Sequence, residues 1–305
     1  MLLSDHKRQG QENNSRGNVG CRFRSGMCRM LAVFMTLVIL ATGSVCAYSG
    51  DKIYRGEILF LAHKGYSGIA PENTLPAIRE AVRAGFGGVE IDVYESKKEK
   101  GKGYKPYIIV SHDKTLTRLT GKNANVRYLT HLTKNYYPIV GNVNGLSTYG
   151  AQYMPTLEEV LNTAWYEAGR YKNPNFVVEI EIKGTMSKAA LKKIIRLVGK
   201  HNVRITTTKY GIAKKLRKYR KHKTTQIWMY KEPKGAKRAK LYIRRAAKCK
   251  ATGVSMPATF WTDANIKYAK KHHLKLAAIT QSKSQARRLI NAGFNRICTD
   301  WKMFE

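Results

Sequence analysis

Two histidines and two carboxylates stand at the ends of short apolar runs between residues 58 and 113. His63 ends the run EILFLAH, His112 follows the run PYIIVS, and Glu90 and Asp92 lie two positions apart in VEIDV. Residues two apart on a strand point to the same face, so both carboxylates are expected to project together. Because two adjacent carboxylates repel each other, the pair predicts a bound hard divalent cation with oxygen ligands, Ca²⁺ or Mg²⁺.

A second acidic segment supplies similar groups further along the chain. Glu179, Glu181 and Lys183 alternate in EIEIK, so they share one strand face and could add an acid and an amine to the same site. Lys64 and Lys183 would place positive charge beside a phosphoryl group. Two histidines beside a metal ion can divide the work, one removing a proton from the nucleophile and the other protonating the leaving group.

Each of these motifs has a simpler interpretation when it is taken alone. A single E-x-D pattern is more often a salt-bridged strand, and a single histidine is more often structural. Two histidines at matching strand ends, flanked by acids, favour a catalytic site.

The apolar runs of the chain predict the elements that must position these residues. Continuous apolar runs are typical of parallel strands buried on both faces. The short tip after residue 95 is rich in glycine and lysine, so its two flanking strands can form a hairpin, which leaves eight strands for a (β/α)8 TIM barrel over residues 58–305. Candidate strands lie at residues 58–62, 89–93, 106–110, 175–183, 203–206, 226–229, 252–255, 274–279 and 296–298.

Helical spacing of apolar residues separates most of these strands. Helices are predicted at residues 74–85, 155–168, 187–201, 210–220 and 235–248. Residues 114–154 have little periodicity, and a loop of this length in a compact domain is typical of a lid or rim of a functional site.

An ordered set of motifs resembles the glycerophosphodiester phosphodiesterase family. The motifs are HKGYSGIAPENT, VEIDV, SHDKTLTRLT, MPTLEEVL, EIEIK and INAGFNRICTDW, and the resemblance spans roughly residues 59–301. It implies a metal-dependent (β/α) barrel enzyme, a phosphoric diester hydrolase that converts glycerophosphodiesters to glycerol 3-phosphate and an alcohol. The resemblance also implies site residues: His63 and His112 as the catalytic pair, Glu90, Asp92 and Glu181 as metal ligands, Lys64 and Lys183 as phosphate-binding groups, and Glu72 and Asp113 as supporting acids.

The chain departs from the family pattern at Lys64, where the family usually has arginine.

Two alternative functions stay open at this point. One is a phospholipase D of the sphingomyelinase type, which acts on intact lipids, and the other is a non-catalytic secreted module that binds polyanions.

The charge of the chain predicts attraction to polyanions. The net charge is +36, from 56 Lys+Arg against 20 Asp+Glu, and such a surface favours an anionic membrane or a wall polymer as partner. Nucleic acid is not expected as a partner, because the basic helical stretches have the pattern of solvated outer helices of a barrel.

Residues 1–47 are expected to form a secretory signal peptide or a membrane anchor. A basic lead precedes the apolar run 30–47, which ends in Val45-Cys46-Ala47, a suitable cleavage site. Either form would place the rest of the chain, a linker at 48–57 and the barrel at 58–305, outside the cytoplasm. Cys249 and Cys298 could form one disulfide in an oxidising compartment, but they have no metal-site or redox spacing, and two unpaired cysteines are favoured.

Overall fold

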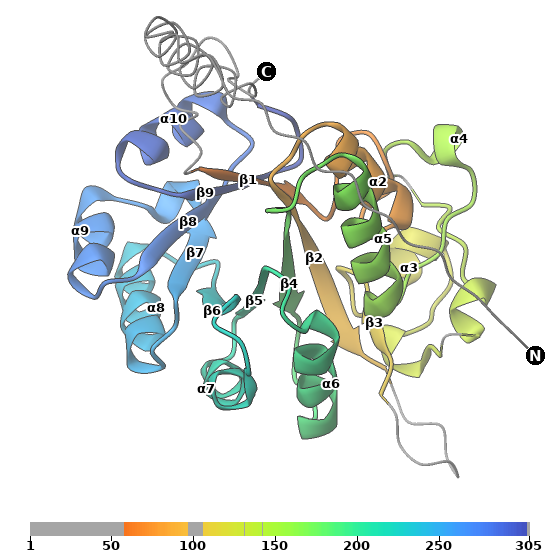
Figure 1. Ribbon diagram of the computed structural model, residues 1–305, viewed down its shortest axis with the longest axis horizontal. Helices are drawn as coiled ribbons and strands as arrows, with labels where there is room; N and C mark the ends of the chain where they lie inside the picture. The colour runs from red at the N-terminus through yellow and green to blue at the C-terminus, as the bar shows by residue number, and fades with distance from the viewer. Residues whose placement is uncertain (1–57, 97–105, 131, 142, 304–305) are drawn as a thin grey trace, which may run out of the picture. The chain divides into compact units, whose positions relative to one another are not determined.

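Eight parallel strands close into a barrel in the computed structural model of the chain, which describes residues 58–96, 106–130, 132–141 and 143–303 (Figure 1). The strands pair in the order β1, β9, β8, β7, β6, β5, β4, β2, and pairing of β2 with β1 closes the ring. The (β/α)8 barrel predicted from the sequence is therefore confirmed. Its strands are β1 (Leu59–His63), β2 (Gly88–Glu95), β4 (Val177–Ile182), β5 (Val203–Thr207), β6 (Thr225–Tyr230), β7 (Gly253–Pro257), β8 (Lys275–Ile279) and β9 (Arg296–Thr299).

Several expectations fall on residues outside the described part. These are the signal peptide or anchor at 1–47, the linker at 48–57 and the lysine-rich tip at 97–105. Among the residues that are described, no helix has the length and apolar character needed to cross a bilayer.

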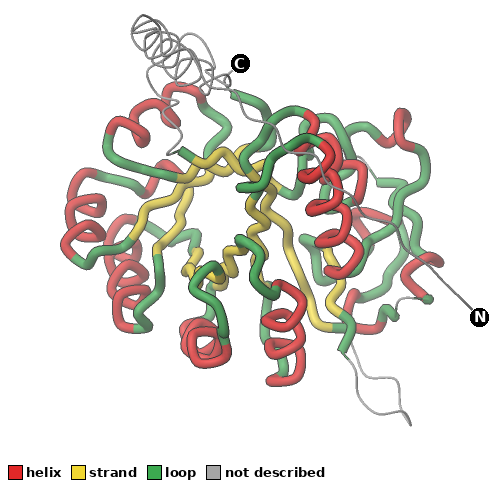
Figure 2. Tube along the Cα trace, in the orientation of Figure 1, coloured by secondary structure: helices red, strands yellow, loops and turns green. Residues whose placement is uncertain are grey.

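Helices surround the barrel (Figure 2). They are α2 (Leu75–Arg83), α5 (Leu157–Arg170), α6 (Lys188–Val198), α7 (Tyr210–Tyr219), α8 (Ala236–Lys248), α9 (Asp263–Lys271) and α10 (Lys283–Asn291). Local signals fix their starts: the Ser187 side chain accepts the Ala190 N–H at the start of α6, and Thr156 and Glu159 form a capping box at the start of α5.

The strands of the site are buried on both faces. Every residue of β4 is buried, as are the first six of β2. Val89, Ile91 and Val93 belong to the main hydrophobic core, so the alternation of the strand turns Glu90 and Asp92 toward the barrel interior. Strand β2 thus has an apolar face, which packs in the hydrophobic core, and an acidic face, which points into the barrel.

A hairpin and a long insert follow β2. Strand β3 (Ile108–Val110) is antiparallel to β2, which confirms the predicted hairpin. Residues 114–154, hereafter the insert, contain only short elements and have a small core of their own that includes Leu116, Val126 and Met154. These elements are α3 (Thr117–Thr120), η1 (Val126–Tyr128), η2 (Thr133–Tyr136) and α4 (Leu146–Tyr149), and a further short turn, η3 (Ala258–Phe260), follows β7.

A buried ion pair fills the barrel below the mouth. The Arg296 guanidinium pairs with the Glu179 carboxylate, and it lies 4.8 Å from the ring centroid of Trp228. Glu179 shares a strand face with Glu181, but it pairs with Arg296 deeper in the barrel and does not join the carboxylates at the mouth. Cys249 and Cys298 are free and buried, which confirms the expectation that they are unpaired.

Candidate active site

The carboxyl ends of β1, β2 and β4 bring the predicted site residues to one edge of the barrel. His63 on β1 is in register with Glu90 on β2, and Asp92 on β2 is in register with Glu181 on β4. Since functional side chains of (β/α) barrels gather at this end of the strands, the parallel register itself assembles the site.

Three buried carboxylates form a compact cluster at this edge. Glu90, Asp92 and Glu181 each offer one oxygen atom, and these atoms all lie within 4.8 Å of one another. The Asn73 amide fixes Asp92, donating to its Oδ2 at 3.1 Å and accepting its backbone N–H at 3.1 Å. The Lys64 N–H donates to Glu90 Oε2 at 3.2 Å.

The cluster fits a hard divalent cation. Glu90 Oε1 is buried and has no hydrogen-bond partner, and a buried polar atom without a partner is costly. An all-oxygen set of three carboxylates is the donor chemistry that Ca²⁺ and Mg²⁺ prefer. The three residues predicted as metal ligands are therefore together, with an acceptor atom still available.

Lys183 lies among the carboxylates. Its Nζ is 2.9 Å from Asp92 Oδ1 and 3.0 Å from Glu181 Oε1, and the side chain is largely buried. Burial would lower the pKa of Lys183, but the charges of Asp92 and Glu181 outweigh burial and raise it. Lys183 thus places a permanent positive charge in the predicted location, although its direct contacts here are carboxylates.

The acids differ in their protonation. Burial, with the charges of Asp92 and Glu181, raises the pKa of Glu90 well above its usual value. Burial raises the pKa of Glu181 to about 7, although Lys183 opposes this. Burial alone would raise the pKa of Asp92 too, but the charge of Lys183, followed by those of His112 and His63, lowers it. Because the pKa values of Glu90 and Glu181 are raised, protons compete with a cation for these two carboxylates.

Each predicted catalytic histidine is held through Nδ1 by a carboxylate. His63 Nδ1 is 2.7 Å from Asp300 Oδ1, and His112 Nδ1 is 2.8 Å from Asp113 Oδ1. Burial would raise the pKa of both aspartates, but hydrogen bonds from their histidines outweigh it and lower the pKa, so both are ionised acceptors. Each ring therefore donates from Nδ1 and keeps Nε2 for other chemistry; Nε2 of His63 lies 3.9 Å from Glu90 Oε2.

An arginine connects the two predicted supporting acids. The Arg118 guanidinium donates from Nη2 to Glu72 Oε1 at 2.6 Å and from Nη1 to Glu72 Oε2 at 3.2 Å. Its Nε donates to Asp113 Oδ2. Glu72 also lies 3.5 Å from Lys64 Nζ, so these four residues form one polar chain beside His112.

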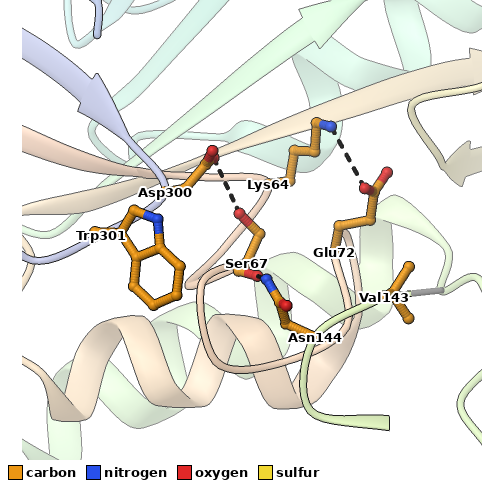
Figure 3. A pocket seen from close by; sticks show the side chains of 7 residues that line it. All are labelled: Lys64, Ser67, Glu72, Val143, Asn144, Asp300 and Trp301. Carbon is orange, nitrogen blue, oxygen red and sulfur yellow. Dashed lines mark hydrogen bonds and ion pairs between the residues drawn. The ribbon is translucent and has the colours of Figure 1, made fainter. Parts of the chain in front are cut away.

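Two cavities lie near the site. One, of about 300 Å³, is lined by Asp300, which holds His63, and by Lys64 and Glu72, which contact each other in its wall (Figure 3). Its lining consists of Lys64, Ser67, Glu72, Val143, Asn144, Asp300 and Trp301. The other, of about 640 Å³, is lined in part by Tyr94 and Lys114. Tyr94 also donates to the backbone carbonyl of His112 at 3.4 Å, but none of the predicted site residues lines this second cavity.

Four contributors to the site were not identified from the sequence. One is Asn73, whose amide fixes Asp92. Asp300 holds His63 from 237 positions away, Arg118 comes from the insert, and Asn144 donates to the Ser67 carbonyl at 2.8 Å. Asp300 and Arg118 stand in quoted motifs, TDW and TRLT, but no spacing rule ties them to the histidines.

Comparison with known proteins identifies the family. The family model described as the Glycerophosphoryl diester phosphodiesterase family matches residues 63–301. The chain belongs to this family. The match contains every residue predicted for the site, from His63 to Lys183.

Curated relatives resemble a shorter stretch. A glycerophosphodiester phosphodiesterase of Caldanaerobacter subterraneus subsp. tengcongensis is 27% identical over 148 residues, which are 48% of this chain and 54% of the relative. Lysophospholipase D GDPD1 of Homo sapiens is 30% identical over 148 residues, which are 47% of this chain and 41% of the relative. The chain thus spans about half the length of these curated relatives or less.

Solved structures of family members share the barrel. A phosphodiesterase of Oleispira antarctica, in complex with the product sn-glycerol-3-phosphate, aligns with a TM-score of 0.63 and 18% identity, covering 82% of this chain and 96% of the other. A glycerophosphodiester phosphodiesterase of Thermotoga maritima aligns with a TM-score of 0.59 and 21% identity, covering 81% and 96%.

Proposed function

We propose that the chain hydrolyses glycerophosphodiesters to glycerol 3-phosphate and an alcohol, as a phosphoric diester hydrolase that uses Ca²⁺ or Mg²⁺. The observation that carries this proposal is the cluster of Glu90, Asp92 and Glu181 with both histidines close by, in a chain of this family. The names of the relatives and the product bound to the Oleispira enzyme support the same substrate class.

The three carboxylates would hold the divalent cation. When bound, the cation supplies positive charge that neutralises a phosphodiester oxygen. Asn73 keeps the Asp92 carboxylate in one orientation, which pre-organises the cluster. Lys183, among the carboxylates, and Lys64, beside Glu72, would add positive charge near the phosphate group.

The histidines carry the proton transfers in this proposal. Because Asp300 and Asp113 fix Nδ1–H of the two rings, one neutral ring accepts a proton through Nε2 from the attacking hydroxyl. This hydroxyl belongs either to water or to the substrate itself, and in the second case water then opens the cyclic phosphate that forms first. The other ring, protonated, donates from Nε2 to the oxygen of the leaving alcohol. The P–O bond to the leaving alcohol breaks as the bond to the attacking oxygen forms.

One cavity suits part of a diester. A phosphodiester carries two alcohol groups on one phosphorus atom, and the cavity lined by Lys64, Glu72 and Asp300 gives one of these groups a place.

Incubation of the full chain with a panel of glycerophosphodiesters and Ca²⁺ or Mg²⁺ tests the activity. We expect glycerol 3-phosphate and the alcohol in equal amounts, and no release from any member of the panel would overturn the proposal.

Alanine variants test the roles of the histidines. His63→Ala and His112→Ala should each lower turnover by at least about 100-fold, the effect typical of a lost general acid or base. His222→Ala, in the turn before β6, is the matched control and should retain wild-type turnover. Near-normal turnover in either site variant would contradict the assignment.

A further inference from the structure

The outer surface of the insert exposes large apolar side chains. Tyr128, Leu132, Tyr136 and Val140 are 63%, 64%, 68% and 58% exposed, one residue at every fourth position. We call these four residues the apolar rim. Single exposed apolar residues are ordinary. However, five of the nine large exposed apolar residues in the described part of the chain lie in the insert, the fifth being Tyr153.

The exposed side chains of the apolar rim are not core residues that the insert leaves unburied. The insert has a core of its own in which Leu116, Val126, Leu129 and Met154 are buried. Tyr128 immediately precedes the buried Leu129 and follows the exposed Arg127. Polar residues would serve as well at the rim positions if the rim met only water.

Hydrogen bonds hold Tyr136 and Val140 of the apolar rim close to the C-terminal end of α3. The Lys122 ammonium donates to the Tyr136 carbonyl at 3.0 Å, and the Val140 N–H donates to the Leu119 carbonyl at 2.8 Å. Leu132 directly precedes η2, which contains Tyr136. The rim therefore combines apolar side chains with a lysine at close range.

All charged side chains of the insert are basic. Residues 114–154 contain five basic residues and no acidic residue. Arg118 and Lys134 form ion pairs with carboxylates outside the insert, while Lys114, Lys122 and Arg127 are exposed. An insert that exposes tyrosine, leucine and basic side chains, and that has no carboxylate of its own, complements an anionic lipid surface.

We propose that the apolar rim, with Lys114, Lys122 and Arg127, docks the protein on an anionic lipid bilayer. Tyrosine and leucine side chains enter the region of the lipid headgroups, and the basic groups meet the lipid phosphates. The insert contacts the site through Arg118 and Asn144, so docking brings the mouth of the barrel to the bilayer. That last consequence rests on the proposed function, whereas the docking itself does not.

Vesicle co-sedimentation of the full chain tests the docking. We expect binding to vesicles of phosphatidylcholine with phosphatidylglycerol that exceeds binding to phosphatidylcholine alone. The double variant Leu132→Ser/Tyr136→Ser should lower the partition coefficient by at least about tenfold, because two apolar side chains no longer enter the lipid. Tyr166→Ser is the matched control, since Tyr166 on α5 is 67% exposed, and it should bind like wild type.

Three outcomes would overturn the proposal. They are no binding to anionic vesicles, wild-type binding by the double variant, and an equal loss in the Tyr166→Ser control. Residues 30–47 are common to all variants, so they cannot produce a difference between them. Unchanged melting temperature and unchanged hydrolysis of soluble glycerophosphodiesters by the double variant separate a docking defect from a failure of the proposed activity.

Discussion

The ring of His112 is held by polar contacts that reach back to Lys64. Asp113 holds the ring, Arg118 binds Asp113 and Glu72, and Glu72 approaches Lys64. The family usually has arginine where this chain has Lys64, and a lysine is a point charge without a planar fork. The guanidinium in this part of the site comes from Arg118 in the insert.

Loss of that fork should weaken catalysis without unfolding the chain. Arg118→Lys keeps the positive charge but cannot bind Glu72 through two nitrogens and Asp113 through a third. We expect kcat/KM for the preferred glycerophosphodiester to fall about tenfold, a loss of about 1.4 kcal/mol. Arg244→Lys, at an exposed position of α8 far along the chain from the site residues, should change kcat/KM less than twofold, and equal effects of the two variants would contradict the positioning role.

Protons and the cation compete for the carboxylates. The pKa of Glu181 is raised to about 7, so the folded protein binds more protons than the unfolded chain between its usual pKa and about 7. The stability of the metal-free protein therefore falls as pH rises through this window. Cation binding changes in the opposite direction, because deprotonated carboxylates are the ligands.

Calorimetric titration with Ca²⁺ or Mg²⁺ measures this competition. At pH 6 the apparent dissociation constant should be about tenfold weaker than at pH 8, since the cation must then displace about one further proton. Titrations in buffers of different ionisation enthalpy should show proton release on binding. The same affinity at both pH values would contradict the protonation state that we assign to the cluster.

At the scale of elements, strand alternation made most of the site predictable. Continuous apolar runs gave the parallel strands, and residues two apart gave the shared face of Glu90 and Asp92 and of Glu181 and Lys183. The insert was predictable only as an irregular segment, because its helices are too short for periodicity. Asp300 was not predictable as a partner of His63, because barrel closure brings together residues that are distant in sequence.

The capping box of α5 links the insert to the barrel helices. Thr156 Oγ1 accepts the Glu159 N–H at 3.3 Å, and Glu159 Oε2 accepts the Thr156 N–H at 2.6 Å. Thr156→Ala should lower the free energy of unfolding in urea by about 1 kcal/mol, as for other lost N-caps. Thr224→Ala, at an exposed turn position, should lower it much less. A cap variant as stable as the wild-type chain would show that the box does not hold the start of α5.

Closure of the whole barrel completes the site. Pairing of β1 with both β2 and β9 places His63 between Glu90 on one side and Asp300 on the other. Below this level, the Arg296–Glu179 pair occupies the interior. Among the residues that the structure describes, Glu90, Asp92 and Glu181 are the one group of three or more His, Cys, Asp or Glu side chains that could hold a metal ion. The proposed activity therefore requires a cation at Glu90, Asp92 and Glu181.

Release of glycerol 3-phosphate before and after chelation tests that dependence most directly. The full chain is assayed as prepared, after EDTA treatment and dialysis, and after addition of Ca²⁺ or Mg²⁺, with divalent metal content measured at each stage. We predict that chelation abolishes release, that Ca²⁺ or Mg²⁺ restores it to the wild-type chain, and that neither restores it to Glu90→Gln. Full release from protein shown to be free of divalent metal would contradict the account.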